Sequence, residues 1–214
     1  MAQLLPSPVL ASVAPRIIIP GFFIFQKVKT MTDPALISQT IAFTALFVAS
    51  VVSLFHGQPW LSIIPAIAAI SYSYMLSDQE NTDKYRYGDW FLTTPLMLTA
   101  ILIANKQPWS LIGVLGFLDI EMIAAGYLGI QSKDDTKMLK WFIVGMLAFV
   151  PILYYLWIQK GTPTAVSLTL GLWCLYPIVY YLNEIKTLTP TATTVSYSVM
   201  DVLAKVGLVW LLHY

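Results

Sequence analysis

Residues 193–213 read TTVSYSVMDVLAKVGLVWLLH, an almost wholly apolar stretch that contains Asp201 and Lys205. About 20 apolar residues are enough for a helix to cross the ~30 Å hydrocarbon core of a bilayer. A lysine at the centre of such a helix costs roughly 2.5–3.5 kcal/mol even on mild insertion scales. Lys205 is therefore predicted to be a functional residue. Asp201 lies one helical turn before it and is predicted to supply its counter-anion.

The composition of the whole chain is that of a membrane protein. Its 214 residues are 57% hydrophobic and 11% charged, whereas an average soluble domain is about 25% charged. Short connections rich in proline, glycine and charge predict that successive helices are antiparallel neighbours. We therefore predict an all-α, seven-transmembrane-helix bundle, an integral multi-pass protein of the plasma membrane. The predicted spans are 34–55, 59–77, 85–104, 109–130, 138–159, 164–183 and 193–213.

The charges between the spans predict how the bundle is oriented. The loops with Lys106 and Lys160 contain no acidic residue, whereas the loops on the other side mix acids with lysines. The positive-inside rule then places the C-terminus in the cytoplasm and the N-terminus outside. Residues 1–33 are predicted to form an extracellular or interfacial extension, and residues 34–214 the helical domain. The composition excludes a soluble enzyme, and no basic patch indicates nucleic-acid binding.

The third span contains the sequence RYGDWFLTTP at residues 86–95. Arg86, Asp89 and Thr93 follow a spacing of i, i+3, i+7, which places them on one face of a helix. An arginine and an aspartate inside a bundle are expected to pair with each other. Together with Asp201 and Lys205 they form a charge cluster of no evident stabilising use, since buried ion pairs rarely stabilise a protein. No metal-ligand set is expected.

Four segments together resemble the microbial rhodopsins, and the bacteriorhodopsin-like members in particular. RYGDWFLTTP is similar to the family's counterion segment, and DVLAKVG at 201–207 is similar to its chromophore-attachment segment. WCLYP at 173–177 resembles its aromatic retinal wall, and PAIA at 65–68 with Tyr72 also matches. The resemblance implies a seven-helix protein that binds all-trans-retinal through a lysine Schiff base.

Residue by residue, the resemblance implies that Lys205 carries the retinal and that Asp89 and Asp201 are its counterions, with Asp89 also the proton acceptor. Arg86 and Glu184 are expected on the extracellular side, Thr93 is expected to hydrogen-bond near Asp89, and Tyr72 toward Asp201. The remaining pocket residues implied by the resemblance are Trp90, Thr94, Met97, Met122, Gly126, Trp173, Tyr176, Pro177 and Tyr180.

One position departs from the pattern of the family's proton pumps. Those pumps carry a carboxylate eleven residues after the counterion, and it returns the proton to the Schiff base. Ala100 stands there in this chain. Reprotonation would then have to come from water and is expected to be slow. The family's proton pumps commonly carry a pair of extracellular glutamates. Glu184 matches one of them, and Thr193 stands at the position of the other.

Two acids in the fourth span need separate interpretations. Asp119 matches a position that the resemblance implies to be protonated and hydrogen-bonded near the retinal ring. Glu121 matches no family position, and it points about 200° around the helix from Asp119. A contact in a homo-oligomer is the more informative interpretation of Glu121, and a protonated, internally bonded side chain is the alternative.

Three functions of different classes remain open. The first is a light-driven proton pump that transports protons outward slowly, indicated by Asp89, Thr93 and Glu184. The second is a light-gated cation channel, as some viral and algal relatives are. The third is a photosensor without ion transport. The expected partners are the lipid bilayer, the transported proton or other cation, and further copies of the same chain.

Overall fold

The computed structural model describes residues 33–55 and 59–213. Within them the chain forms seven α-helices, and each of them, α2 together with the turn that precedes it, is long and apolar enough to cross a membrane. These are α1 (Pro34–Phe55), α2 (Ile63–Ser77), α3 (Thr82–Ala104), α4 (Trp109–Ile130), α5 (Asp135–Trp157), α6 (Pro163–Glu184) and α7 (Pro190–His213), with the short 3₁₀ turns η1 (Pro59–Ser62) and η2 (Gln79–Asn81). The all-α, seven-span fold expected from the sequence is confirmed.

Helices α1, α5 and α7 each start at a side-chain cap. Asp33 accepts a hydrogen bond from the backbone N–H of Ala35 at the start of α1, and Thr189 does the same for Ala192 at the start of α7. At α5, Asp134 accepts from two backbone N–H groups of the first turn. These oxygens satisfy donors that a helix leaves unpaired at its N-terminus.

Three of the predicted spans begin a few residues later than the observed helices. Helix α3 starts at Thr82 rather than 85, α5 at Asp135 rather than 138, and α7 at Pro190 rather than 193. The polar first turns of α5 and α7, which the hydropathy pattern excludes, are helical because the Asp134 and Thr189 caps and Pro190 favour that geometry. Helix α3 begins without a side-chain cap. The predicted extension, residues 1–33, lies outside the described residues except for Asp33.

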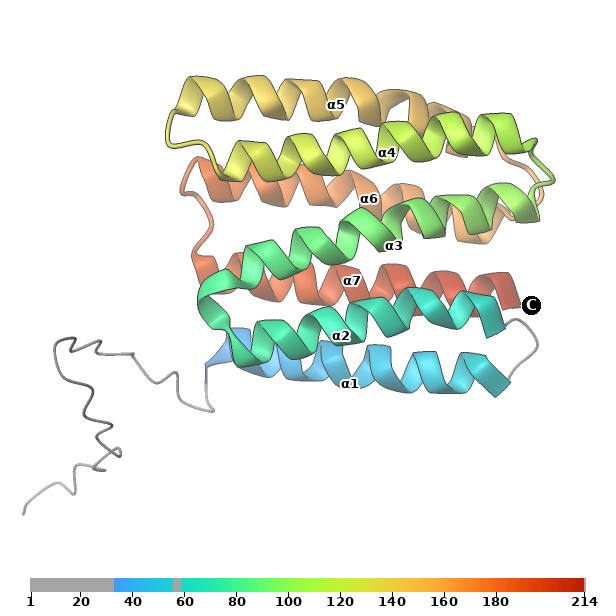
Figure 1. Cartoon of the computed structure of the whole chain (residues 1–214), viewed down its shortest axis with the longest axis horizontal. Coiled ribbons are helices and arrows are strands. Elements are labelled where there is room, and N and C mark those ends of the chain that lie inside the picture. Colours follow the sequence, from blue (N-terminus) through green and yellow to red (C-terminus); the bar gives the residue numbers. More distant parts are fainter. Residues whose placement is uncertain (1–32, 56–58, 214) are drawn as a thin grey trace, which may run out of the picture.

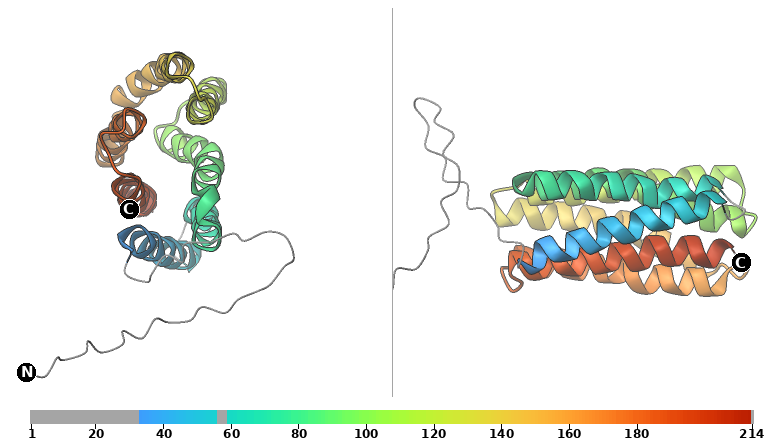
Figure 2. Two further views of the ribbon diagram at one scale, coloured as in Figure 1. Left: turned by 90° about the vertical axis from the view of Figure 1, so that its left-hand side faces the viewer. Right: turned by 90° about the horizontal axis from the view of Figure 1, so that it is seen from below.

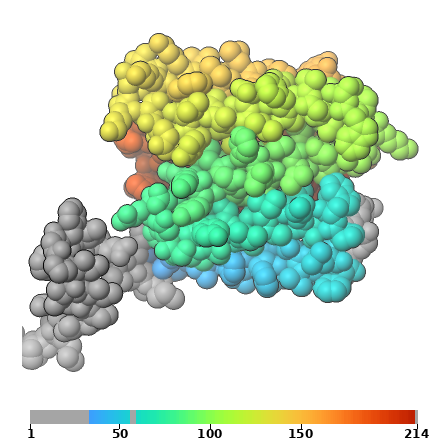
Figure 3. All heavy atoms as spheres, in the orientation of Figure 1, coloured from blue at the N-terminus to red at the C-terminus, as the bar shows by residue number. Residues whose placement is uncertain are grey.

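The seven helices run side by side, and each is antiparallel to the next along the chain (Figure 1). Seen from the end, they surround a central space in the order of the sequence, and α7 returns to lie beside α1 (Figure 2). The C-terminus lies at the same end of the bundle as the α3–α4 and α5–α6 connections. Viewed from outside, the surfaces of α2, α3, α4 and α5 pack against one another (Figure 3).

The largest buried core occupies the half of the bundle toward the C-terminal end. It is built from aliphatic side chains of α3, α4, α5, α6 and α7, with fully buried Leu98, Ile101, Leu102, Leu115, Ile152, Leu156 and Leu208. A second cluster of tyrosine, tryptophan and methionine side chains packs nearer the other end, around Trp90 and Tyr197. Asp89 of α3 and Asp201 and Lys205 of α7 are buried between these two apolar layers.

Candidate functional site

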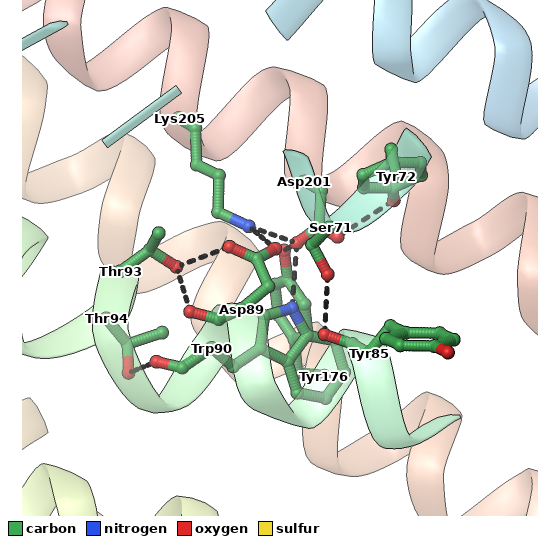
Figure 4. A network of polar contacts seen from close by, with 10 residues as sticks. All are labelled: Ser71, Tyr72, Tyr85, Asp89, Trp90, Thr93, Thr94, Tyr176, Asp201 and Lys205. Atoms are coloured by element: carbon green, nitrogen blue, oxygen red, sulfur yellow. Dashed lines mark hydrogen bonds and ion pairs between the residues drawn. The ribbon is translucent and has the colours of Figure 1, made fainter. Parts of the chain in front are cut away.

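Lys205 lies in the middle of the bundle, with 1% of its surface exposed. Its amine is 2.5 Å from the Asp89 Oδ2 atom of α3 and 3.2 Å from the Asp201 Oδ1 atom of its own helix. Both carboxylates are fully enclosed. The two acids and the lysine that the sequence singled out therefore meet at one point (Figure 4).

Asp201 is held by three further donors. Its Oδ1 atom accepts from the Trp90 indole N–H at 3.0 Å and from the Tyr176 hydroxyl at 2.8 Å. Its Oδ2 atom accepts from the Tyr72 hydroxyl at 2.8 Å, the hydrogen bond expected from the sequence. Charge-assisted hydrogen bonds of this kind stabilise a buried carboxylate. Both oxygens of Asp201 are therefore already satisfied by hydrogen bonds.

Asp89 has fewer hydrogen-bond partners than Asp201. Among the described residues, the Asp89 side chain is bonded only by Lys205 and by the Thr93 hydroxyl, which lies 3.1 Å from Oδ1 and 2.9 Å from the Asp89 carbonyl oxygen. A carboxylate with few donors is the one that gains most from an additional proton, because hydrogen bonds to the charged form favour that form. Of the two acids, Asp89 is the better placed to accept a proton from the Lys205 nitrogen.

The prediction that Arg86 forms an ion pair with Asp89 is wrong. Arg86 forms its ion pair with Asp83, one turn toward the start of α3, and its guanidinium lies over the Tyr197 ring at 4.7 Å from the centroid. Lys205 already occupies the Asp89 carboxylate. Arg86 is buried, and its Nε atom has no hydrogen-bond partner among the described residues.

Glu184 lies outside the lysine cluster, in the last turn of α6. Its carboxylate accepts from the Asn183 side-chain amide at 3.0 Å, and the Asn183 oxygen accepts from the Thr193 hydroxyl at 2.9 Å. The structure therefore joins Glu184 and Thr193 through Asn183, a connection that the sequence did not reveal. This chain of polar groups is at the same end of the bundle as Asp83.

Asp119 and Glu121 lie in opposite environments, as the helical geometry of α4 predicts. Asp119 is fully buried, and the Thr94 hydroxyl donates to its Oδ2 atom at 2.6 Å. Its other oxygen has no partner among the described residues. Glu121 is exposed on the outer surface of the same helix, so its expected alternative as an internally bonded side chain is wrong.

A cavity begins at Lys205 and extends between the helices toward α5. About 790 Å³ of empty space lies between its walls, and part of that space is open to the outside. Its walls are almost entirely apolar and aromatic. The nine implied pocket residues other than Tyr72 all line it: Trp90, Thr94, Met97, Met122, Gly126, Trp173, Tyr176, Pro177 and Tyr180.

The sequence interpretation missed the contribution of α5 to this cavity. The additional lining residues are Tyr87, Ile123, Trp141, Phe142, Gly145, Met146, Phe149, Tyr197 and Ala204. Five of these residues lie on α5, namely Trp141, Phe142, Gly145, Met146 and Phe149. That helix is apolar on nearly all sides, so hydropathy alone does not single them out. An apolar slot that ends at a buried primary amine fits a long apolar aldehyde, because the walls contact the chain and the amine can bond to the carbonyl carbon.

Ala100 is 1% exposed and packs within the aliphatic core. Its neighbours in that core are leucine, isoleucine and aromatic side chains, with no carboxylate among them. The side of Lys205 toward the C-terminal end of the bundle thus offers no acidic group in the described residues of the core.

Comparisons with known proteins agree with this geometry. Residues 35–214 match the family model described as bacteriorhodopsin-like protein. A bacteriorhodopsin-II-like protein of Haloquadratum walsbyi is 30% identical over 176 residues, which cover 68% of this chain and 71% of the relative. The crystal structure of a cyanorhodopsin from Tolypothrix sp. NIES-4075 has a TM-score of 0.78 at 25% identity, covering 86% of this chain and 95% of that one.

A light-driven proton pump from Coccomyxa subellipsoidea has the same fold. The TM-score is 0.76 at 24% identity, and the match covers 86% of this chain and 97% of that one. Family model, relatives and structures agree on one assignment. The chain belongs to the bacteriorhodopsin-like family of microbial, type 1 rhodopsins.

Proposed function

We propose that this retinal-binding membrane protein is a light-driven proton pump that transports protons outward and slowly. All-trans-retinal bound at Lys205 supplies the absorption of visible light and the isomerisation that redirects the nitrogen's N–H. The bond forms when Lys205 Nζ condenses with the aldehyde carbon and one water is released. The pocket residues around the cavity hold the apolar chain and exclude water.

The observation that carries the proposal is that the two counterions, Asp89 and Asp201, have unequal numbers of hydrogen-bond donors. The proton on Lys205 Nζ has Asp89 Oδ2 as its nearest acceptor, at 2.5 Å. Asp201 is already bonded by Tyr72, Trp90 and Tyr176. Asp89 therefore accepts the proton, and Asp201 remains the fixed anion that balances the site.

The polar groups beyond Asp89 support an outward direction. Arg86, Asp83 and Glu184 lie toward the end of the bundle that the loop charges assign to the outside. A proton that leaves Asp89 toward that end passes the Arg86–Asp83 pair and then the polar groups around Glu184. Arg86 and Glu184 thus act after Asp89.

The half of the bundle toward the C-terminal end accounts for the slow return of a proton to Lys205. The core around Ala100 is filled by leucine and isoleucine side chains, so a proton must reach Lys205 from water across an apolar layer. The same packing supports a pump rather than a channel, because an ion-conducting channel needs a polar path through both halves.

Photocurrent recorded against voltage in cells supplied with all-trans-retinal tests this function. A pump gives an outward current that keeps its sign at every voltage near the resting range. A current that reverses with voltage would show a light-gated channel, and no current from a coloured protein would show a photosensor.

We also propose that the chain forms a homo-oligomer through the outer face of α4. Glu121 is exposed there, in the middle of a membrane-spanning helix, beside exposed Val114 and Phe117. A carboxyl group facing lipid is costly unless it finds a polar partner, and a second copy can supply one. Glu121→Leu should therefore change the oligomer size in chemical crosslinking within native membranes, whereas Val114→Leu on the same face should not. Unchanged size for Glu121→Leu contradicts the proposal.

A further inference from the structure

A second cavity lies on the outer side of the helix pair α5 and α6. It is an open groove lined by Phe142, Met146, Phe149 and Leu153 of α5 and by Cys174, Pro177, Ile178, Tyr181 and Leu182 of α6. The α5 residues follow a spacing of i, i+4, i+7, i+11, so they form one stripe of that helix. No charged side chain lines the groove.

The groove and the internal cavity share part of their walls. Phe142, Met146, Phe149 and Pro177 line both. Phe142 stacks on Tyr180 inside, with ring centroids 5.6 Å apart, and packs against Tyr181 outside, at 5.7 Å. These shared side chains lie between the lipid-facing groove and the space that reaches Lys205.

The seam between α5 and α6 is less tightly held than the neighbouring one. Helix α5 packs against α4 along its length and makes far fewer close approaches to α6 (Figure 2). Among the described residues no hydrogen bond joins α5 to α6, and their ring contacts are those of Phe142. Met146 is unbranched and adaptable, so this layer can move without breaking a polar contact.

The two ends of the internal cavity are closed by contrast. Toward the C-terminal end, the aliphatic core fills the bundle with fully buried side chains. Toward the other end, the Trp90 ring packs against Tyr87 and Tyr197, with centroids 5.1 and 5.0 Å away, and Arg86 covers Tyr197. A ligand larger than water therefore meets fewer packed side chains if it enters through the side of the bundle than if it enters through either end.

We propose that retinal reaches Lys205 sideways from the bilayer through the α5–α6 groove, with Phe142 and Met146 as the gate. This inference rests on the proposed retinal binding. Retinal is apolar and dissolves in the hydrocarbon core, so a lipid-facing apolar groove admits it without hydrating it. The groove is continuous with the slot that holds the bound chain, and this continuity is what identifies the occupant.

The test measures retinal uptake by apoprotein produced without retinal and placed in lipid nanodiscs. The rate is followed as growth of the visible band and, separately, as the intact mass of samples reduced with borohydride at timed intervals. Ile178→Trp fills the groove at a residue that does not line the internal cavity. Leu175→Trp is the matched control, because Leu175 is on the same helix, similarly exposed at 44% against 52%, and outside the groove.

Ile178→Trp should slow uptake at least about tenfold, a barrier change of ~1.4 kcal/mol, while the final yield and the position of the band stay those of the wild type. Leu175→Trp should take up retinal at the wild-type rate. Cys174→Trp provides a second groove-filling variant if Ile178→Trp gives a low yield. Met146→Ala should act in the opposite direction, with faster uptake and faster bleaching by hydroxylamine.

Wild-type rates in both groove-filling variants would overturn the route, and the groove would then be a resting place for a lipid acyl chain. A wild-type protein that gains neither colour nor mass would instead refute the proposed function itself. The two failures are therefore distinguishable in one experiment.

Discussion

Gly129 on α4 allows a sharp test of the cavity wall. A Cβ atom at this position would lie 2.1 Å from the Tyr180 hydroxyl oxygen and 3.3 Å from the ring carbon that carries it. Because Tyr180 stacks on Phe142 with an angle of only 8° between the rings, its ring cannot swing away freely. Gly129→Ala should push it by roughly 1 Å, into the slot or against α5.

The magnitude follows from two opposing terms. Overpacking a filled site costs about 1–3 kcal/mol, whereas replacing glycine by alanine inside a helix gains up to ~1 kcal/mol. Gly113→Ala on the same helix isolates the gain, because a Cβ there meets no atom within 4 Å. Gly129→Ala should therefore be less stable than Gly113→Ala by roughly 1–3 kcal/mol in the free energy of unfolding.

Unfolding of the retinal-loaded protein in denaturing detergent measures this difference, and its absorption band reports the displaced ring. The Tyr180 hydroxyl has no hydrogen-bond partner among the described residues, so Tyr180→Phe removes the colliding oxygen without breaking a hydrogen bond. The Gly129→Ala/Tyr180→Phe pair should recover most of the lost stability. If Gly129→Ala and Gly113→Ala have equal stability and equal bands, Tyr180 does not fill this space.

Three further predictions concern proton movements. Asp89→Asn removes the negative charge 2.5 Å from Lys205 Nζ, so the visible band should shift to the red and pumping should stop; an unaltered band in absorption spectroscopy would make Asp201 the working counterion. Ala100→Asp places a carboxyl group that burial keeps neutral in the donor position. Flash photolysis should therefore show that the proton returns to Lys205 faster and with less dependence on pH. A proton return that is already fast and independent of pH in the wild type would reveal another internal donor. At the start of α5, the backbone N–H groups of Lys137 and Thr136 lower the pKa of Asp134. The stabilising contribution of Asp134 is therefore present above the ordinary pKa near 4 and is lost as the pH falls through the lowered pKa. Asp134→Asn, which still caps the helix, should weaken the acid dependence of thermal stability, and an acid profile identical to that of the wild type would contradict this cause.

The sequence predicted the fold and the lysine cluster well for a physical reason. A charged residue in an apolar span is costly, so Lys205, Asp89 and Asp201 had to face one another in the bundle interior. Their helical spacing then determined which faces of α3 and α7 point inward. Lys205 meets both acids in the structure.

The partner of Arg86 could not be predicted in the same way. Asp83 and Asp89 lie one turn before and one turn after it, so helical spacing allows either pair. Lys205 comes from another helix and occupies Asp89, which leaves Arg86 to Asp83. Only the packing of α7 against α3 decides between them.

The contribution of α5 to the cavity was hidden for a different reason. Nearly every side chain of this helix is apolar, so its inward and lipid-facing sides have the same chemistry, and hydropathy does not separate them. Trp141 lines the cavity although it is 36% exposed, and its neighbour in sequence, Phe142, lines both the cavity and the outer groove. The fold, and not the pattern, assigns these residues to the site.

The most direct test of the account is the visible absorption of protein supplied with all-trans-retinal, with and without Lys205→Ala. Lys205 is the buried amine that reaches the cavity. The wild type should be coloured, and borohydride reduction followed by peptide mass analysis should locate the retinal on Lys205. Lys205→Ala should be colourless while its helical content, measured by circular dichroism, is retained. A visible band that persists in folded Lys205→Ala would contradict the central claim.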